Sequence, residues 1–268
     1  MHIKSYYGGV FEIETDNENF IVKVIRDPDT YKIAHIDAEI TFCRFVHEHI
    51  TSFTSQTFIT DKEGGILQQT ADECFYLLKK HSIVKKDTLS NEDQQTIGRL
   101  MRDFHRGLHN FEHKGIGEST WMREVNQKEY ELLLKHFKEE EFVAFVQPLN
   151  YEELNLPKTL LHGDWHGENF SFSNPPFLFD LDTLCYGSPA EEIARTITHW
   201  YSGSSIKNFY KNIIKGYETL SDTEIIIIPR LAVAICYKQF AEVAIYGDLS
   251  YANHFKELAD EVKSAFSI

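Results

Sequence analysis

The stretch LHGDWHGENF, residues 161–170, holds two histidines, two acidic side chains, an amide and two glycines. Two kinds of site can use such a set. His162 and His166 have the spacing of a zinc site, but that spacing binds zinc when both histidines share a helix, and the two glycines disfavour a helix. A phosphoryl-transfer site would instead use Asp164 and Asn169, and the histidines would orient the loop by hydrogen bonds to its backbone. We favour this second interpretation.

Transfer of the terminal phosphoryl group of a nucleotide needs a positioned acceptor, magnesium on the phosphates and a cation that holds them. A carboxylate orients the acceptor hydroxyl and receives its proton, and oxygen ligands hold the metal. Asp164 and Asn169 lie five positions apart on one predicted loop, and Asp180 follows the strand-like segment PPFLF at residues 175–179. This order supplies a carboxylate for the acceptor and two oxygen ligands for the metal.

The N-terminal third of the chain has the pattern of a β-rich region. Apolar and polar residues alternate over residues 9–15 and 20–26 around the turn-prone DNEN, which predicts a β-hairpin. Helical spacing without Gly or Pro predicts one helix over residues 33–50. Three further strand-like segments follow, at residues 55–60, 66–70 and 74–80.

Beyond His81 the pattern becomes helical. Ser90 and Asp93 form a capping-box-like start for a long helix. We expect further helices over residues 123–140 and 192–200, after residue 204 and through the C-terminal third, with short strands and loops over 160–182. The expected domains are an N-terminal nucleotide-binding lobe, residues 1–81, and a C-terminal helical lobe with the catalytic loop and acceptor site, residues 82–268.

The order of motifs resembles a known family. LHGDWHGENF, then FDLD at residues 179–182 and GSPAEEIA at 187–194, closely resembles the aminoglycoside phosphotransferase and choline kinase superfamily, whose catalytic loop reads H-G-D-x-x-x-x-N. Upstream, residues 97–109 resemble the family's L-G-x-x-x-x-x-L-H helix. The resemblance implies an α+β, protein-kinase-like fold in two lobes: a small antiparallel-sheet N-lobe with one helix, and a larger, mostly helical C-lobe.

The resemblance also implies roles for single residues. Asp164 corresponds to the catalytic base, and Asp182 is an auxiliary acid near the metal or the acceptor. Asn169 and Asp180 correspond to the Mg²⁺ ligands. Lys23 matches the strand lysine that contacts the α- and β-phosphates, and Glu39 on the following helix matches its ion-pair partner.

The nucleotide-binding residues implied by the resemblance are Gly8 and Gly9 in the phosphate loop and Leu78, Lys79, Lys80 and His81 in the hinge that meets adenine. Family members often carry a longer loop, whereas Gly8 and Gly9 here run almost directly into the next strand. A shorter loop offers fewer backbone N–H groups to phosphate and places more of the binding on Lys23 and magnesium.

Glu192 stands where the family motif G-x-P-x-x-D-x-A has Asp. We expect Glu192 to cap the helix that begins near Ala190, because a negative charge at a helix N-terminus is favourable. His105 and His109 have helical spacing, and we expect packing or surface positions for both.

Composition narrows the class of protein further. The four cysteines are widely spaced, which predicts reduced thiols rather than disulfides or a zinc site. With 27 Lys and Arg against 41 Asp and Glu, the net charge is −14; this disfavours a nucleic-acid partner and permits a cationic substrate. No apolar run is long enough to span a bilayer and the start has no signal-peptide core, so we expect a cytoplasmic protein without a membrane partner.

Together these features predict a phosphotransferase that moves the terminal phosphoryl group of ATP or GTP to a hydroxyl of a small molecule, aminoglycoside-, choline- or homoserine-like, with Mg²⁺ as cofactor. Two alternatives remain open. One is a bacterial protein Ser/Thr kinase of the same fold. The other, motivated by the short Gly8–Gly9 loop, is a nucleotide-binding pseudo-kinase with little turnover.

Overall fold

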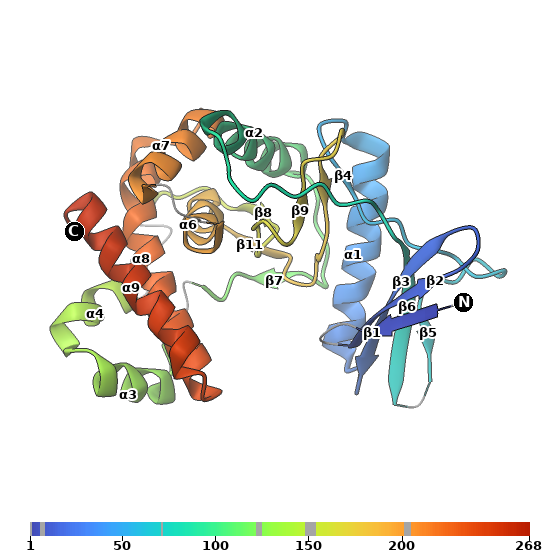
Figure 1. The fold of residues 1–268 in the computed structure, drawn as a ribbon, viewed down its shortest axis with the longest axis horizontal. Coiled ribbons are helices and arrows are strands. Elements are labelled where there is room, and N and C mark those ends of the chain that lie inside the picture. The colour runs from blue at the N-terminus through green and yellow to red at the C-terminus, as the bar shows by residue number, and fades with distance from the viewer. Residues whose placement is uncertain (1, 6–8, 71, 122–124, 148–153, 201–204) are drawn as a thin grey trace. The chain divides into compact units, whose positions relative to one another are not determined.

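The computed structural model describes residues 2–5, 9–70, 72–121, 125–147, 154–200 and 205–268 (Figure 1). The chain divides into two compact units. Unit 1 comprises residues 1–85, 111–116 and 169–182, and unit 2 comprises residues 86–110, 117–168 and 183–268.

A five-stranded antiparallel sheet forms the centre of unit 1, in the order β1-β2-β3-β6-β5. Its strands are β1 His2–Ser5, β2 Val10–Glu14, β3 Asn19–Arg26, β5 Gln68–Gln69 and β6 Glu73–Lys79. The hairpin predicted over residues 9–26 is confirmed as β2 and β3. Lys23 pairs with Val10 on one side and with Tyr76 on the other, so it lies on the central strand.

One helix, α1 Thr30–His49, packs on this sheet. The Asp29 side chain caps it by accepting the backbone N–H of Lys32 at 2.7 Å. Ile36 and Ile40 of α1 form one apolar cluster with three buried side chains of β6, which are Cys74, Tyr76 and Leu78. The predicted helix over residues 33–50 is therefore present, and it begins three residues earlier.

A second sheet in unit 1 has the order β4-β10-β9, with β4 Thr54–Ser55, β9 Phe170–Ser171 and β10 Phe177–Leu178. The prediction of one strand over residues 55–60 is wrong, because that segment divides between two partners. Thr54 and Ser55 pair in parallel with β10, whereas Phe58 forms an isolated bridge with Leu78 of β6.

Unit 2 is mostly helical. Its helices are α2 Asn91–Gly107, α3 Gln127–His136, α4 Glu139–Val146, α6 Pro189–Trp200, α7 Ile206–Tyr217, α8 Asp222–Ile245 and α9 Leu249–Phe266. α8 packs against both α9 and α6, and α2 packs along α7 (Figure 1). The capping box of Ser90 and Asp93 starts α2 as predicted. α8 runs through Pro229 without a break in the helix.

The single helix predicted over residues 123–140 is wrong. The structure has α3 and α4 instead, separated by Phe137 and Lys138, whose backbones are extended. Phe137 is buried with its ring edge-on to Tyr237 and Phe240 of α8, at centroid distances of 5.0 and 4.8 Å. Burying this ring on α8 fixes the bend between the two helices, and residues 123 and 124 lie outside the described residues.

A small sheet in unit 2 has the order β7-β11-β8, with β7 Gly117–Glu118, β8 Thr159–Leu161 and β11 Cys185–Gly187. β8 leads directly into the loop that begins at His162, and β11 leads into α6. All four cysteines are free thiols, as expected. Among the described residues, no helix is both long and apolar enough to cross a membrane.

Candidate active site

The loop after β8 turns sharply at Gly163, which has a φ of +80°. A Cβ at this position would lie 2.1 Å from the carbonyl oxygen of Thr183, so only glycine fits the close approach. The Thr183 hydroxyl in turn donates to the carbonyl of His162 at 2.9 Å. These contacts fix the backbone immediately before Asp164.

Both histidines of the loop orient its backbone, as the sequence suggested. Nδ1 of His162 accepts the N–H of Asp164 at 3.3 Å, and Nδ1 of His166 accepts the N–H of Glu168 at 3.1 Å. Because Nδ1 of His166 is an acceptor, the neutral ring carries its proton on Nε2, which lies 3.2 Å from Oδ2 of Asp164. His166 therefore supports the loop and also donates to the candidate base.

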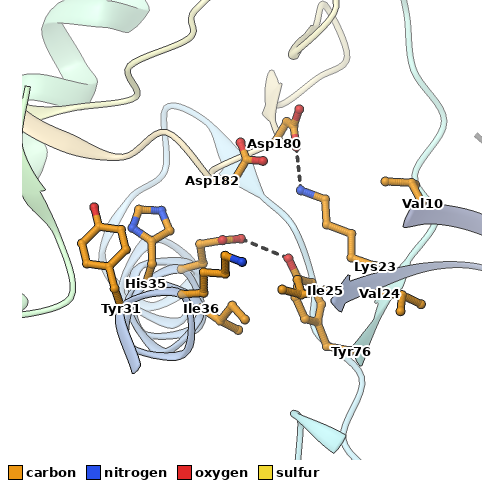
Figure 2. A pocket seen from close by; sticks show the side chains of 12 residues that line it. Val10, Lys23, Val24, Ile25, Tyr31, His35, Ile36, Tyr76, Asp180 and Asp182 are labelled. Atoms are coloured by element: carbon orange, nitrogen blue, oxygen red, sulfur yellow. Dashed lines mark hydrogen bonds and ion pairs between the residues drawn. The ribbon is translucent and has the colours of Figure 1, made fainter. Parts of the chain in front are cut away.

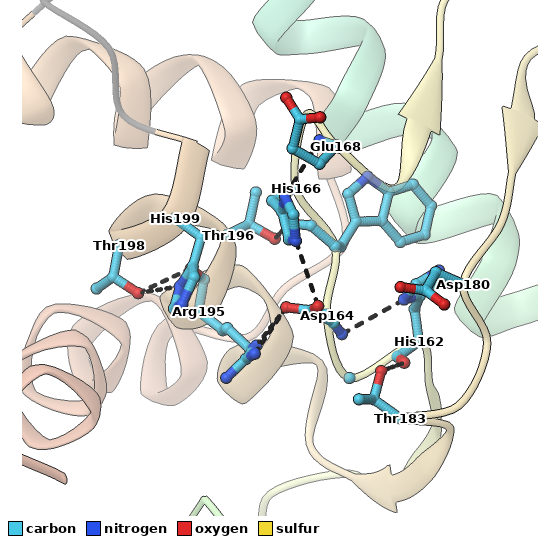
Figure 3. A network of polar contacts seen from close by, with 12 residues as sticks. His162, Asp164, His166, Glu168, Asp180, Thr183, Arg195, Thr196, Thr198 and His199 are labelled. Carbon is cyan, nitrogen blue, oxygen red and sulfur yellow. Dashed lines mark hydrogen bonds and ion pairs between the residues drawn. The ribbon is translucent and has the colours of Figure 1, made fainter. Parts of the chain in front are cut away.

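Asp164 has a second, stronger partner in Arg195 of α6 (Figure 3). Nη2 and Nε of Arg195 donate to Oδ1 of Asp164 at 2.6 and 3.2 Å, and the guanidinium lies 3.9 Å from the centre of the Trp121 ring. Burial alone would raise the pKa of Asp164, but the hydrogen bond from His166 and the charge of Arg195 hold that pKa well below its ordinary value. Asp164 is an oriented carboxylate that stays ionised.

Glu192 has a different role from the one expected. Its carboxylate accepts the N–H of His162 at 3.2 Å and that of Gly163 at 2.7 Å, so it stabilises the loop that holds Asp164. Glu191 makes the contact with its own helix start instead, by accepting the N–H of Ser188 at 2.9 Å. The expectation that Glu192 caps α6 is therefore wrong: its side chain is buried and committed to the loop.

His105 is buried and completes this support. Its Nε2 lies 2.9 Å from Oε2 of Glu192, and its Nδ1 lies 2.9 Å from the hydroxyl of Tyr217. Burial would raise the pKa of Glu192, but hydrogen bonds and charge from His105 outweigh it and lower that pKa. His109 is exposed, and its Nδ1 lies 2.9 Å from the carbonyl oxygen of Arg106.

In unit 1, Lys23 and Asp180 point toward each other and both line a cavity of about 480 Å³ (Figure 2). Nζ of Lys23 lies 2.6 Å from Oδ1 of Asp180. Glu39 and Asp182 also line this cavity. Burial would lower the pKa of Lys23, but the carboxylates of Asp180, Glu39 and Asp182 raise it above its ordinary value, so the ammonium stays charged.

The ion pair expected between Lys23 and Glu39 is not the one that the structure forms. Lys23 pairs with Asp180, and Glu39 accepts a long hydrogen bond from the Tyr76 hydroxyl at 3.4 Å. Burial raises the pKa of Glu39 to about 7, against the lowering effect of Lys23. Asp180 is the better partner because its side chain is 41% exposed, so its charge keeps much of its hydration, whereas Glu39 is 1% exposed.

Asn169 and Asp180 lie at the same end of the β9–β10 pair. Phe170 pairs with Leu178, and the N–H of Phe179 donates to the carbonyl of Asn169 at 3.2 Å. The two residues expected to bind magnesium are thus adjacent across one short hairpin. Their oxygens, a carboxylate and an amide, belong to the ligand class that Mg²⁺ prefers, and the exposed part of Asp180 leaves room for the water that Mg²⁺ retains. The donor set fits the metal.

The residues expected around the nucleotide belong to unit 1, except that Gly8 lies outside the described residues. Gly9 has a φ of +80°, and a Cβ there would lie 2.5 Å from the carbonyl of Val24. In the predicted hinge, Leu78 is buried, whereas Lys79 and Lys80 are exposed. Lys79 pairs with Glu18, Lys80 pairs with the buried Glu12, and the His81 ring lies against Phe177.

Sequence reasoning missed Arg195, the loop-stabilising role of Glu192 and two residues that contact the Asp180 segment, Gln56 and His35. Gln56 accepts the N–H of Asp180 at 2.9 Å, and Nε2 of His35 lies 3.4 Å from the carbonyl of Leu181. Nothing in the local sequence pattern marks these residues. Each acts through a contact with a distant part of the chain.

The antiparallel sheet with one helix and the mostly helical second unit define an α+β protein of the protein-kinase-like class. A family model described as "Phosphotransferase enzyme family" matches residues 4–225, and the chain belongs to this family. The predicted relationship to the aminoglycoside phosphotransferase and choline kinase superfamily is confirmed. No curated protein sequence matches the chain.

Several solved structures share the fold. The amicoumacin kinase hAmiN, in complex with AMP-PNP, Ca²⁺ and Ami, is similar with a TM-score of 0.73 and 15% identity over 99% of this chain and 87% of that one. A microcompartment-associated aminopropanol kinase has a TM-score of 0.66 and 15% identity over 98% and 92%. The choline kinase LicA from Streptococcus pneumoniae has a TM-score of 0.61 and 16% identity over 98% and 94%.

Proposed function

We propose that the protein transfers the terminal phosphoryl group of ATP or GTP to a hydroxyl group of a small molecule. The observation that carries this proposal is the pair of Lys23 and Asp180 in the unit 1 cavity, with Nζ and Oδ1 2.6 Å apart. Phosphoryl transfer needs a cation on the phosphates beside a carboxylate that binds the metal. Membership of the phosphotransferase family and the kinase titles of the similar structures support the same reaction.

In this mechanism Asp164 accepts a hydrogen bond from the acceptor hydroxyl and aligns its oxygen for in-line attack. The low pKa of Asp164 means that it orients the hydroxyl and receives the proton late, when the oxygen has lost most of its electron density to phosphorus. Arg195 and His166 hold the carboxylate in that orientation. Asp164 is the proposed catalytic base, and its two partners are positioning residues.

On the nucleotide side, Lys23 would move from Asp180 onto the phosphate oxygens, where its raised pKa keeps it charged. Asn169 and Asp180 would hold Mg²⁺, and Asp182 would act as an auxiliary acid. The metal, when bound, neutralises charge on the phosphates. Gly8, Gly9 and the hinge residues Leu78, Lys79, Lys80 and His81 complete the proposed nucleotide site.

The proposed acceptor is a small hydroxylated molecule. Three of the similar structures are kinases named for amicoumacin, aminopropanol and choline, and another is a complex of an aminoglycoside phosphotransferase with GDP and kanamycin. Amino alcohols, aminocyclitols and hydroxy amino acids are therefore the first compounds to test with ATP and with GTP. Labelling of a generic protein substrate in preference to all of these would favour the protein-kinase alternative.

The decisive experiment compares Asp164→Asn with the wild type. Asn keeps the size of the side chain but removes the base, so phosphoryl transfer should fall by at least about 100-fold while nucleotide binding stays the same. Asp103→Asn, a half-buried aspartate of α2 that pairs with Arg102, is the control and should keep full activity. Wild-type turnover in Asp164→Asn would contradict the proposed role of Asp164, and absence of any Mg²⁺-dependent nucleotide turnover in the wild type would contradict the proposed function.

A further inference from the structure

Asp180 has an unusual backbone for a residue with a side chain. Its φ of +62° lies in the left-handed region, which costs a residue with a Cβ some strain, although Asp tolerates it better than most. Such a conformation persists only where neighbouring groups hold it. The contacts around Asp180 therefore indicate what the fold does to place this carboxylate.

The backbone N–H of Asp180 is held by Gln56, just after β4. Its side chain is 4% exposed, and its Oε1 accepts the backbone N–H of Asp180 at 2.9 Å. Because the N–H can only donate, the orientation of the amide is determined, and Nε2 must point away. Nε2 is buried and has no hydrogen-bond partner among the described residues. The fold thus leaves one donor of Gln56 unsatisfied while its oxygen holds Asp180.

His35 of α1 holds the other side of the same turn. It is 8% exposed, and its Nε2 lies 3.4 Å from the carbonyl oxygen of Leu181, while its Nδ1 lies 3.3 Å from the carbonyl oxygen of Gly115. Both distances are long, and a neutral ring has one N–H to donate to one of the two carbonyls, so the hold of His35 is weaker than that of Gln56. The backbone N–H of Asp180 and the backbone C=O of Leu181 are therefore both in contact with buried side chains.

These two anchors leave the Asp180 side chain with a defined direction. Figure 2 shows Asp180 facing Lys23, with His35 projecting from α1 into the same cavity. If the Asp180 backbone relaxed to a negative φ, its Cβ would swing away from this direction and the carboxylate would leave the end of the hairpin that it shares with Asn169.

We propose that Gln56 and His35 are positioning residues for the metal-binding carboxylate, and that they act by holding Asp180 in its left-handed conformation. This inference rests on the proposed function, because it concerns Asp180 as a ligand of the metal that accompanies the nucleotide. Neither residue touches substrate or metal. Their effect should appear in metal affinity more than in turnover once the metal saturates.

The first test replaces Gln56 with Met, which matches its size but cannot accept a hydrogen bond, and with Glu, which keeps an acceptor oxygen. Free Mn²⁺ is measured by electron paramagnetic resonance in the presence of AMP-PNP. Gln56→Met should weaken Mn²⁺ binding by about tenfold, and Gln56→Glu should bind within about threefold of wild type. Gln69→Met, an exposed side chain on the edge strand β5, is the matched control and should bind as wild type does.

The second test separates positioning from simple structural support. In Gln56→Met, the Mg²⁺ concentration for half-maximal turnover should rise about tenfold, while turnover at saturating Mg²⁺ stays within about threefold of wild type. His35→Phe should raise the Mg²⁺ concentration for half-maximal turnover by a smaller factor. His35→Gln keeps an N–H donor, so its Mg²⁺ requirement should lie between those of His35→Phe and wild type. If Gln56→Met does not fold, the comparison of His35→Phe with His35→Gln tests the inference by itself.

Unchanged Mn²⁺ affinity in folded Gln56→Met and His35→Phe would overturn the inference while leaving the proposed function intact. A wild-type protein that binds Mn²⁺ with nucleotide but transfers no phosphate would overturn the proposed function; the loss of Mn²⁺ affinity in Gln56→Met would then still support the positioning role. A wild-type protein that binds no Mn²⁺ with nucleotide would overturn both.

Discussion

Arg195 places two N–H groups on a single oxygen of Asp164, with Nη2 at 2.6 Å and Nε at 3.2 Å from Oδ1. Because both bonds go to Oδ1, the other oxygen remains for His166. The carboxylate is therefore oriented from two sides before any substrate arrives. The guanidinium is itself held by the Trp121 ring, so the orientation of Asp164 depends on α6 and on the segment before residue 122.

Replacing Arg195 with Met should raise the pKa of Asp164, because the depressed pKa relies on the Arg195 charge and hydrogen bonds. The acidic limb of the kcat/KM profile should then move to higher pH, and kcat/KM at neutral pH should fall by about 10- to 100-fold as the carboxylate loses its orientation. Arg230→Met, which removes an exposed arginine on α8, is the control. An unchanged acidic limb in Arg195→Met would show that Arg195 does not set the ionisation of Asp164.

Substituting Gly163 with Ala should distort the catalytic loop. The new Cβ would meet the Thr183 carbonyl at 2.1 Å, in addition to the strain of a positive φ. Gly247 offers a matched control, since its φ is +89° and a Cβ there would have nothing within 4 Å. Gly247→Ala should lose only about 1–2 kcal/mol of unfolding free energy and no activity, whereas Gly163→Ala should lose more stability and at least about tenfold in kcat. Equal losses in both variants, by urea denaturation and turnover, would contradict this account.

The loop at residues 162–170, the presence of α1 and the start of α2 could be predicted because their signals are local: a D-x-x-x-x-N spacing, an apolar stripe, a capping box. The contacts that hold the loop could not be predicted from the sequence. The sequence marks Glu192 only as a helix cap and does not mark Arg195 at all, yet both are buried, at 2% and 8% exposure. Their burial depends on the packing of β8 and the loop against α6. No short segment of the sequence encodes this packing.

The prediction of the ion-pair partner of Lys23 was wrong for a similar reason. The family resemblance implied Glu39 as the partner of Lys23, but Glu39, Asp180 and Asp182 all line the same cavity. Which carboxylate pairs with the ammonium is decided by distance and desolvation in the folded protein. The split of residues 55–60 between β10 and β6 likewise depends on partners that are more than a hundred residues away in one case.

Removing the Glu192 carboxylate should unfold the protein more readily, because it would leave two backbone N–H groups and His105 without their acceptor. Glu192→Ala should lose about 3–5 kcal/mol of unfolding free energy, and Glu192→Gln, which keeps one acceptor oxygen, should lose less. The lowered pKa means that the ionised carboxylate stabilises the fold fully above its ordinary pKa and loses this effect as the pH falls through the folded value. Chemical denaturation at several pH values measures both effects, with the exposed Glu257→Gln as control. A stability equal to wild type in Glu192→Ala would remove Glu192 from the support of the loop.

Glu39 should make the protein less stable as the pH rises. Its pKa in the fold is about 7 against an ordinary value of 4.5, mainly through burial, so between these values the unfolded chain has released a proton that the folded protein retains. Stability therefore falls as the pH rises from about 4.5 to 7, and the full effect is at most roughly 3 kcal/mol. Glu39→Gln cannot titrate and still accepts from the Tyr76 hydroxyl, so it should match wild type near pH 4.5 and exceed it in unfolding free energy at pH 8. Urea denaturation at both pH values tests this, with Glu48→Gln on the exposed face of α1 as control. A difference between Glu39→Gln and wild type that does not change with pH would mean that Glu39 ionises normally in the fold.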